Sequence, residues 1–175
     1  MIREKLNKAI RTIPDFPKRG IDFKDITPLF KDPNLTDDII DAFIKRLDKM
    51  KVDAIVGIES RGFLFGFLLA NRMKIPFIPI RKSGKLPGET LSVKYDLEYG
   101  SSEIEIHKYD VKEDWNVVIH DDLLATGGTA CAAADLLLQL KTNILAFTFV
   151  VNLDFLDGKI KLEKYKSSII SLIDY

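Results

Sequence analysis

Short continuous apolar runs alternate along this chain with segments of helical periodicity. The runs are residues 54–58, 76–80, 117–119, 145–151 and 169–173. Runs of this kind are typical of strands that are buried on both faces of a parallel sheet. Helices are predicted at about 63–72 and 129–140, and strand–helix–strand order implies right-handed crossovers. The pattern therefore predicts an α/β fold with a mostly parallel central sheet flanked by helices.

Two further helices are predicted before the first buried run. Apolar side chains recur with helical spacing from Ile2 to Ile13, and Pro14 is expected to end that helix. The second helix follows Thr36, whose hydroxyl suits an N-cap position ahead of two aspartates. The chain between these two helices is turn-rich from Pro14 to Gly20.

Residues 91–106 follow the pattern of a hairpin. Apolar and polar side chains alternate from Leu91 to Tyr99, which predicts a strand with one solvated face. A turn at Gly100 and a return strand through Ile104 and Ile106 complete the hairpin. Because this pattern interrupts the parallel one, we expect the hairpin to leave the sheet as a mobile loop that can fold over a site.

Length and composition limit the possible functions. The 175 residues suit one domain spanning 1–175, and 26 basic against 26 acidic residues give no net attraction to nucleic acid or anionic membranes. The longest apolar run, residues 63–70, is too short to cross a bilayer. The charged N-terminus lacks an apolar signal core, so a cytoplasmic location is expected. The single Cys131 excludes an intrachain disulfide and is interpreted as a small buried hydrophobe.

The segment 117–129 carries the most informative chemistry. A buried run leads into Asp121 and Asp122, a loop of small residues follows, and a helix starts near Thr129. Such a loop can surround a phosphate with backbone N–H groups, and the helix N-terminus adds positive potential. Ionised carboxylates accept hydrogen bonds from vicinal hydroxyls. A ribose phosphate therefore fits this segment. No lysine occupies the loop, which excludes a P-loop.

The nine residues from Asp121 to Thr129 resemble the motif of type I phosphoribosyltransferases that binds phosphoribosyl pyrophosphate (PRPP), in its adenine-specific form. Residues 14–28 resemble the N-terminal hood of that family, 60–63 its pyrophosphate loop, and 80–88 with 97–100 its mobile loop. The similarity spans roughly residues 13–155. His120, the pair Glu113–Asp114 and the segment after Asp157 depart from the family pattern, but none of these departures removes a residue with an expected chemical role.

The resemblance implies the type I phosphoribosyltransferase fold, with a hood formed mainly by about 1–35, and transfer of the phosphoribosyl group of PRPP to adenine. It also implies Mg²⁺ bound through PRPP or pyrophosphate rather than by a protein metal site, and a homodimer. Glu98 is the expected acid–base residue for the proton on adenine, and Arg61 is also expected to act in catalysis. The residues expected to bind PRPP and AMP are Asp121, Asp122, Ala125, Thr126, Gly127, Gly128 and Thr129. Those expected to bind pyrophosphate are Ser60, Arg61, Arg81, Lys82 and Lys85. Adenine is expected to stack on Phe23, to contact the main chain of Asp22 and Lys24, and to have its other face covered by Leu123.

Simpler interpretations and two other functions stay open. Without the resemblance, Glu98 and the basic residues would be solvated surface groups, and Phe23 and Leu123 would be core residues. A related enzyme could use hypoxanthine, guanine, xanthine or orotate. A PRPP-sensing regulator would bind without catalysis, although the chain has no room for an added DNA-binding domain and its net charge is zero.

Overall fold

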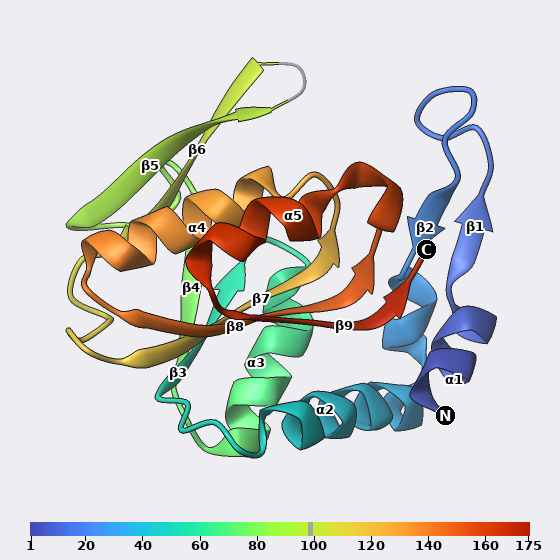
Figure 1. The fold of residues 1–175 in the computed structure, drawn as a ribbon, viewed down its shortest axis with the longest axis horizontal. Coiled ribbons are helices and arrows are strands. Elements are labelled where there is room, and N and C mark those ends of the chain that lie inside the picture. Colours follow the sequence, from blue (N-terminus) through green and yellow to red (C-terminus); the bar gives the residue numbers. More distant parts are fainter. Residues whose placement is uncertain (98–99) are drawn as a thin grey trace.

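The computed structural model describes residues 1–97 and 100–175, and within this part seven strands form the main sheet (Figure 1). Their order is β5-β6-β4-β3-β7-β8-β9. The strands are β3 (Ala54–Ile58), β4 (Phe77–Lys82), β5 (Thr90–Leu97), β6 (Gly100–His107), β7 (Asn116–Leu124), β8 (Asn143–Asn152) and β9 (Ser168–Asp174). The pairs β4–β3, β3–β7, β7–β8 and β8–β9 are all parallel, which confirms the predicted mostly parallel sheet.

Helices cover both faces of the sheet and bury two separate hydrophobic clusters (Figure 1). One face packs against α2 (Pro33–Leu47) and α3 (Gly62–Met73), and the other against α4 (Gly128–Gln139) and the short α5 (Gly158–Leu162). Alternate strand residues supply the two clusters, with Val118 in the first and Val117 and Ile119 in the second. The short 3₁₀ segments are η1 (Thr27–Lys31), η2 (Asp154–Leu156) and η3 (Glu163–Tyr165).

The N-terminal segment differs from its prediction in two places. The first helix, α1 (Ile2–Ala9), stops before Ile13, and Arg11–Ile13 forms β1, antiparallel to β2 (Phe23–Asp25). Ile13 precedes Pro14, and a residue before proline is driven away from helical geometry. Helix α2 starts at Pro33 with Asp32 as its N-cap, which accepts a hydrogen bond from the Leu35 amide at 3.1 Å. The prediction of Thr36 as the cap was wrong, because its hydroxyl donates to the Leu29 carbonyl.

The predicted hairpin forms, but it extends the main sheet instead of leaving it. β6 pairs antiparallel with β4, with Arg81 opposite Glu105 and Lys82 opposite Ile104. The apolar face of β5 packs on the second cluster through Leu91, Val93 and Tyr95. An antiparallel strand at the edge of an otherwise parallel sheet is common in α/β folds.

No helix in the described ranges is both long and apolar enough to cross a membrane.

Candidate active site

The end of β7 brings the predicted ligand-binding residues to one edge of the sheet. The strand runs to Leu124, so Asp121 and Asp122 lie inside it rather than after it. Helices α3 and α4 both start at this edge, where the carboxyl ends of the parallel strands meet. This edge is where open α/β sheets bind ligands.

Two adjoining cavities lie at this edge. The larger, of about 390 Å³, is lined by Ser60, Arg61 and Lys82 from the predicted pyrophosphate set and by Asp121, Asp122, Leu123 and Thr129 from the other predicted sets. The smaller, of about 80 Å³, is lined by Ala125, Thr126 and Gly127 of the loop before α4 and by Gly128 and Thr129 at the start of that helix. Asp121, Leu123 and Thr129 line both cavities. The structure therefore brings together most of the residues that the sequence assigned to PRPP.

The loop before α4 has a shape that requires glycine at one position. Gly127 has a φ of +79°, and a Cβ there would lie 2.9 Å from the carbonyl oxygen of Gly158. Both features exclude larger side chains, which strain at positive φ. The Thr129 hydroxyl donates to the Tyr95 hydroxyl at 3.3 Å, so β5 of the hairpin contacts this loop directly. The loop thus presents backbone and hydroxyl groups at a helix N-terminus, as an anion site needs.

Asp121 and Asp122 have different surroundings. Asp122 is buried, and its Oδ2 lies 3.0 Å from Nε of Arg61 in an ion pair. The Asp122 amide donates to Oδ1 of Asp121 at 2.8 Å. Burial, followed by the adjacent Asp122 charge, raises the pKa of Asp121 well above its usual value. The sequence suggested two ionised acceptors, whereas burial and the adjacent carboxylate disfavour the charged form of Asp121 in the structure.

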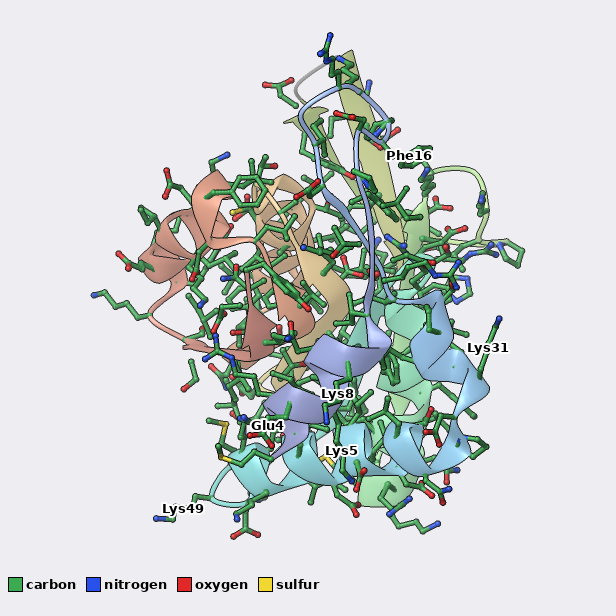
Figure 2. All side chains as sticks on the ribbon, turned by 90° about the vertical axis from the view of Figure 1, so that its right-hand side faces the viewer. Glu4, Lys5, Lys8, Phe16, Lys31 and Lys49 are labelled. Atoms are coloured by element: carbon green, nitrogen blue, oxygen red, sulfur yellow. The ribbon has the colours of Figure 1, made fainter. Side chains whose placement is uncertain are left out.

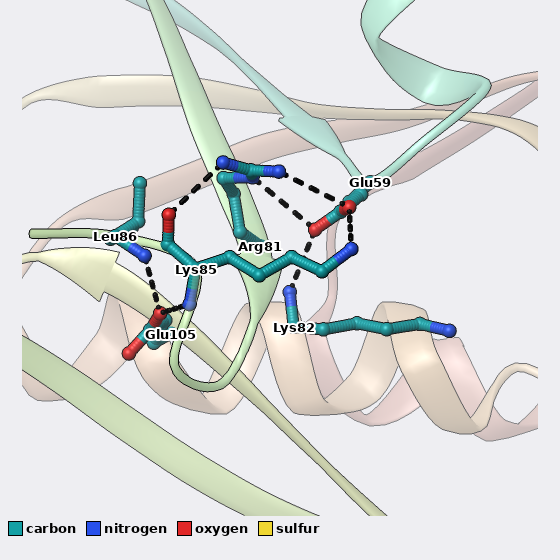
Figure 3. Close-up of polar contacts among 6 residues, drawn as sticks. All are labelled: Glu59, Arg81, Lys82, Lys85, Leu86 and Glu105. Carbon is teal, nitrogen blue, oxygen red and sulfur yellow. Dashed lines mark hydrogen bonds and ion pairs between the residues drawn. The ribbon is translucent and has the colours of Figure 1, made fainter.

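Two of the predicted pyrophosphate-binding cations are bound to a carboxylate of the protein. Arg81 and Lys85 bind the carboxylate of Glu59, while the side chain of Lys82 leads away from that carboxylate (Figure 3). Lys82 is the member of this set that lines the larger cavity together with Ser60 and Arg61. Any contact of Arg81 and Lys85 with pyrophosphate therefore stays a prediction.

The hood residues that were predicted to bind adenine lie apart from the described cavity linings. Phe23 packs edge-on against Phe16 at 5.2 Å, and Lys24 Nζ hydrogen-bonds the Thr12 hydroxyl at 3.0 Å. Asp22 is exposed. Figure 2 shows Phe16 at the outer end of the hood, far from α1. Two hydrogen bonds from Thr27 lower the pKa of Asp25, and the charges of Arg11 and Arg61 add to this effect.

Sequence reasoning missed several residues and left one untested. Glu98 lies outside the described residues. Tyr95 and Ser102 of the hairpin line the larger cavity, and Glu59 contacts the predicted cations. A tyrosine hydroxyl on the otherwise apolar face of β5 was the one available signal for Tyr95. Cys131 is half-buried rather than buried, and its raised pKa, caused first by burial, supports the interpretation that it is not a nucleophile.

The chemistry of the cavity fits a metal that arrives with its ligand. No group of three His, Cys, Asp or Glu side chains in residues 1–97 and 100–175 could hold a metal ion. Asp121 and Asp122 are nevertheless carboxylates that line the larger cavity, and oxygen ligands suit Mg²⁺.

His120 is fully buried beneath this site, and its environment keeps it neutral. Its ring packs edge-on against Phe43 at 5.3 Å, and Nδ1 lies 2.9 Å from the Thr148 hydroxyl. Burial lowers the pKa of His120 to about 3. His120 therefore adds no positive charge beside Asp121 near neutral pH.

We expect His120 to make the fold sensitive to acid. Between pH 6.5 and about 3 the unfolded chain binds a proton that the folded chain excludes, so stability falls as the pH falls. From pH 7 to pH 5 the wild type should lose about 2 kcal/mol more free energy of unfolding than His120→Val. Urea unfolding at both pH values measures this difference. Equal losses in the two proteins would show that the folded state accepts the proton.

The comparisons with known proteins agree with this geometry. The family "Phosphoribosyl transferase domain" matches residues 26–174. The chain is 51% identical over 175 residues to the adenine phosphoribosyltransferase of Thermoanaerobacter pseudethanolicus, covering 100% of both chains, and that enzyme's crystal structure superposes with a TM-score of 0.94. The Saccharomyces cerevisiae adenine phosphoribosyltransferase, solved with adenine and D-2,5-dideoxy-2,5-imino-altritol 1,6-bisphosphate, gives a TM-score of 0.92 at 44% identity, covering 98% of both chains.

Proposed function

Because the chain belongs to the adenine phosphoribosyltransferases, we propose that it transfers the 5-phosphoribosyl group of PRPP to adenine, forming AMP and pyrophosphate in purine salvage. The observation that carries this proposal is the pair of adjoining cavities. They place two carboxylates, an arginine and a glycine-containing anion loop at the carboxyl edge of the sheet. A ribose phosphate needs this combination of groups.

The proposed reaction displaces pyrophosphate from ribose C1 by a ring nitrogen of adenine. The 5-phosphate binds residues 125–129, where backbone N–H groups and two threonine hydroxyls donate to it. Asp121 and Asp122 accept hydrogen bonds from the ribose hydroxyls and stabilise the positive charge that develops at C1. Arg61, Lys82 and the Ser60 hydroxyl bind the leaving pyrophosphate, together with Arg81 and Lys85 of the same segment as Lys82. Phe23 stacks on adenine, the main chain of Asp22 and Lys24 reads its edge, and Leu123 covers its other face.

Mg²⁺ enters this proposal as a metal carried by the diphosphate of PRPP. It would be held by phosphate oxygens, with Asp121 and Asp122 as the nearest protein carboxylates of the larger cavity. When bound, it neutralises charge on the leaving group. The ionised form of Asp121 would be favoured by such a cation, since its pKa is raised by burial and by the adjacent carboxylate.

A panel of bases assayed with PRPP and Mg²⁺ tests the proposed function. Adenine should yield AMP and pyrophosphate, while hypoxanthine, guanine, xanthine and orotate should react far more slowly. Turnover of hypoxanthine but not adenine would contradict the choice of base. Binding of PRPP without formation of AMP would favour the PRPP-sensing regulator.

Glu98 is proposed as the residue that handles the proton on the adenine ring. Glu98→Gln should lower kcat more than it weakens PRPP binding, because the amide keeps the size of the side chain but cannot take up and release a proton as a carboxyl group does. Steady-state kinetics together with a PRPP binding titration separates the two effects. Equal losses in both would limit Glu98 to binding.

We also propose that the partner of this chain is a second copy of itself. Leu64, Phe67 and Leu68 are 48%, 56% and 42% exposed on one face of α3, and Phe63 and Phe67 both pack against the Phe77 ring. Contiguous exposed apolar surface of this kind marks an interface. Helix α3 begins just after Arg61, so a partner on this face would lie beside the cavity.

The dimer proposal predicts a change in mass on charging this face. Phe67→Glu should convert the dimer to a monomer in analytical ultracentrifugation, because a carboxylate would be buried unpaired in the interface. Leu138→Glu is the matched control, since Leu138 is 47% exposed on α4, away from this face. A monomeric wild type, or a dimer that survives Phe67→Glu, would contradict the proposal.

The cytoplasmic location, the single domain and the absence of nucleic-acid and membrane partners stay predictions.

A further inference from the structure

Glu59 is the centre of a polar cluster that sequence reasoning did not assign. It follows β3 directly, and its carboxylate accepts hydrogen bonds from two neighbouring cations (Figure 3). Arg81 donates from Nε at 3.3 Å and from Nη2 at 3.4 Å, and Lys85 donates from Nζ at 2.7 Å. The Lys82 amide donates to the same carboxylate at 3.0 Å. One acidic side chain thus fixes three residues of the segment that the resemblance assigned to pyrophosphate.

Glu59 is charged throughout the physiological pH range. Its side chain is 10% exposed, and burial raises its pKa, but the hydrogen bonds from Lys85, the Lys82 amide and Arg81 outweigh burial and bring the pKa to about 2. A buried carboxylate with this many donors is strongly held, because removing a donor would leave a charge without compensation. The Glu59 amide also donates to the Ile80 carbonyl at 2.9 Å. Glu59 is therefore fixed at both its backbone and its side chain.

A second buried acid fixes the same segment from the other side. Glu105 of β6 accepts hydrogen bonds from the amides of Lys85 and Leu86, both at 2.8 Å. Arg81 closes the segment by donating from Nη1 to the Lys85 carbonyl at 3.0 Å. Residues 81–86 are consequently bound into one unit, in which the side chains of Arg81 and Lys85 cannot reorient without breaking bonds to Glu59.

We propose that Glu59 is a positioning residue for the diphosphate end of PRPP, acting through Arg81 and Lys85; this inference rests on the proposed function. Glu59 and Lys82 line the larger cavity, and the residue that follows Glu59 is Ser60 of the predicted pyrophosphate loop. A rigid carboxylate at this point sets the location of Arg81 and Lys85, in the same segment as the cavity-lining Lys82. The Lys82 amide and the Ile80 carbonyl hold Glu59 itself in place, so it offers the two cations a fixed partner.

Kinetics of Glu59→Gln test the proposal, after the wild type has been shown to form AMP from adenine and PRPP. The amide keeps an acceptor for the Lys82 amide and loses the charge that holds Arg81 and Lys85. We expect the KM for PRPP and the Kd for magnesium pyrophosphate to rise about tenfold, since misplaced binding groups lose affinity steeply. The KM for adenine should stay within about twofold. Glu89→Gln is the matched control, because Glu89 is an exposed acid directly before β5 of the hairpin.

A double-mutant cycle separates positioning from general destabilisation. In an Arg81→Gln/Lys85→Gln background, Glu59→Gln should change the KM for PRPP by less than about twofold, because the two cations through which Glu59 acts are already absent. If Glu59→Gln does not fold, Glu59→Asp, which keeps the charge on a shorter side chain, enters the same cycle with a smaller expected effect. An equal effect of the substitution in both backgrounds overturns the proposal, as does tighter pyrophosphate binding by Glu59→Gln. Failure of the wild type to form AMP would instead overturn the proposed function.

Discussion

Replacing Asp121 and Asp122 together by Asn should lower kcat by at least about 100-fold. The substitution removes the proposed acceptors for the ribose hydroxyls and the negative charge that stabilises the positive charge developing at ribose C1. Asparagine has nearly the same size as aspartate, so packing at the end of β7 should survive. The Asp122–Arg61 ion pair would also be lost, which releases Arg61 from its observed position. Initial rates with saturating adenine and PRPP measure the effect.

The double substitution should leave the fold intact. Burial and the charge of Asp122 raise the pKa of Asp121, so replacing both carboxylates relieves a repulsion instead of creating one. Circular dichroism and a urea unfolding curve should resemble those of the wild type. Asp110→Asn, at an exposed acid whose carboxylate pairs with His107, is the control for loss of a carboxylate elsewhere. Activity near that of the wild type in the double variant would remove both residues from the mechanism.

Periodicity predicted the sheet because each strand of the parallel core is buried on both faces. Residues 54–58 were predicted as a strand, and β3 has the same bounds. The errors arose where a local signal competed with another one. Ile13 continues the apolar spacing of α1, but Pro14 and the pairing of Ile13 with Phe23 hold it extended. Thr36 and Asp32 were both suitable caps, and Pro33 at the first helical position favours Asp32.

The predicted site was most complete where its residues are contiguous in the chain. Residues 121–129 form strand, loop and helix start within one segment, so their order already places them together at the sheet edge. The missed contacts join distant segments: Glu59 with Arg81, Tyr95 with Thr129, and Gly158 with Ala125. A single sequence contains no signal for such pairs. It also contains no measure of burial, which separates the properties of Asp121 from those of Asp122.

Gly158 is the residue outside the motif whose substitution should have the largest effect. It is buried at the start of α5, and a Cβ there would lie 2.2 Å from the carbonyl oxygen of Ala125 and 3.0 Å from the Leu124 side chain. This carbonyl belongs to the loop before α4. The clash is therefore with the backbone, which cannot move aside by a change of rotamer as a side chain can. Gly158→Ala must therefore displace either α5 or residues 125–127.

We expect Gly158→Ala to raise the KM for PRPP about tenfold or more, since a displaced loop no longer aligns its N–H groups with the phosphate. Overpacking should also lower the free energy of unfolding by about 1–3 kcal/mol. Gly66→Ala is the matched control, because its Cβ would meet the side chains of Phe77 on β4 and His120 on β7, at 3.0 and 3.3 Å, and not the backbone of the loop.

The pattern of kinetic changes distinguishes loop displacement from a general loss of structure. Movement of residues 125–127 alone should weaken the binding of PRPP and AMP, because both carry the 5-phosphate. The binding of pyrophosphate should stay unchanged, since Ser60, Arg61 and Lys82 lie on other strands and loops. Equal weakening of pyrophosphate would mean that the whole sheet edge had shifted. An unchanged KM for PRPP would mean that α5 had moved instead, and the C-terminal segment would then have no part in shaping the phosphate site.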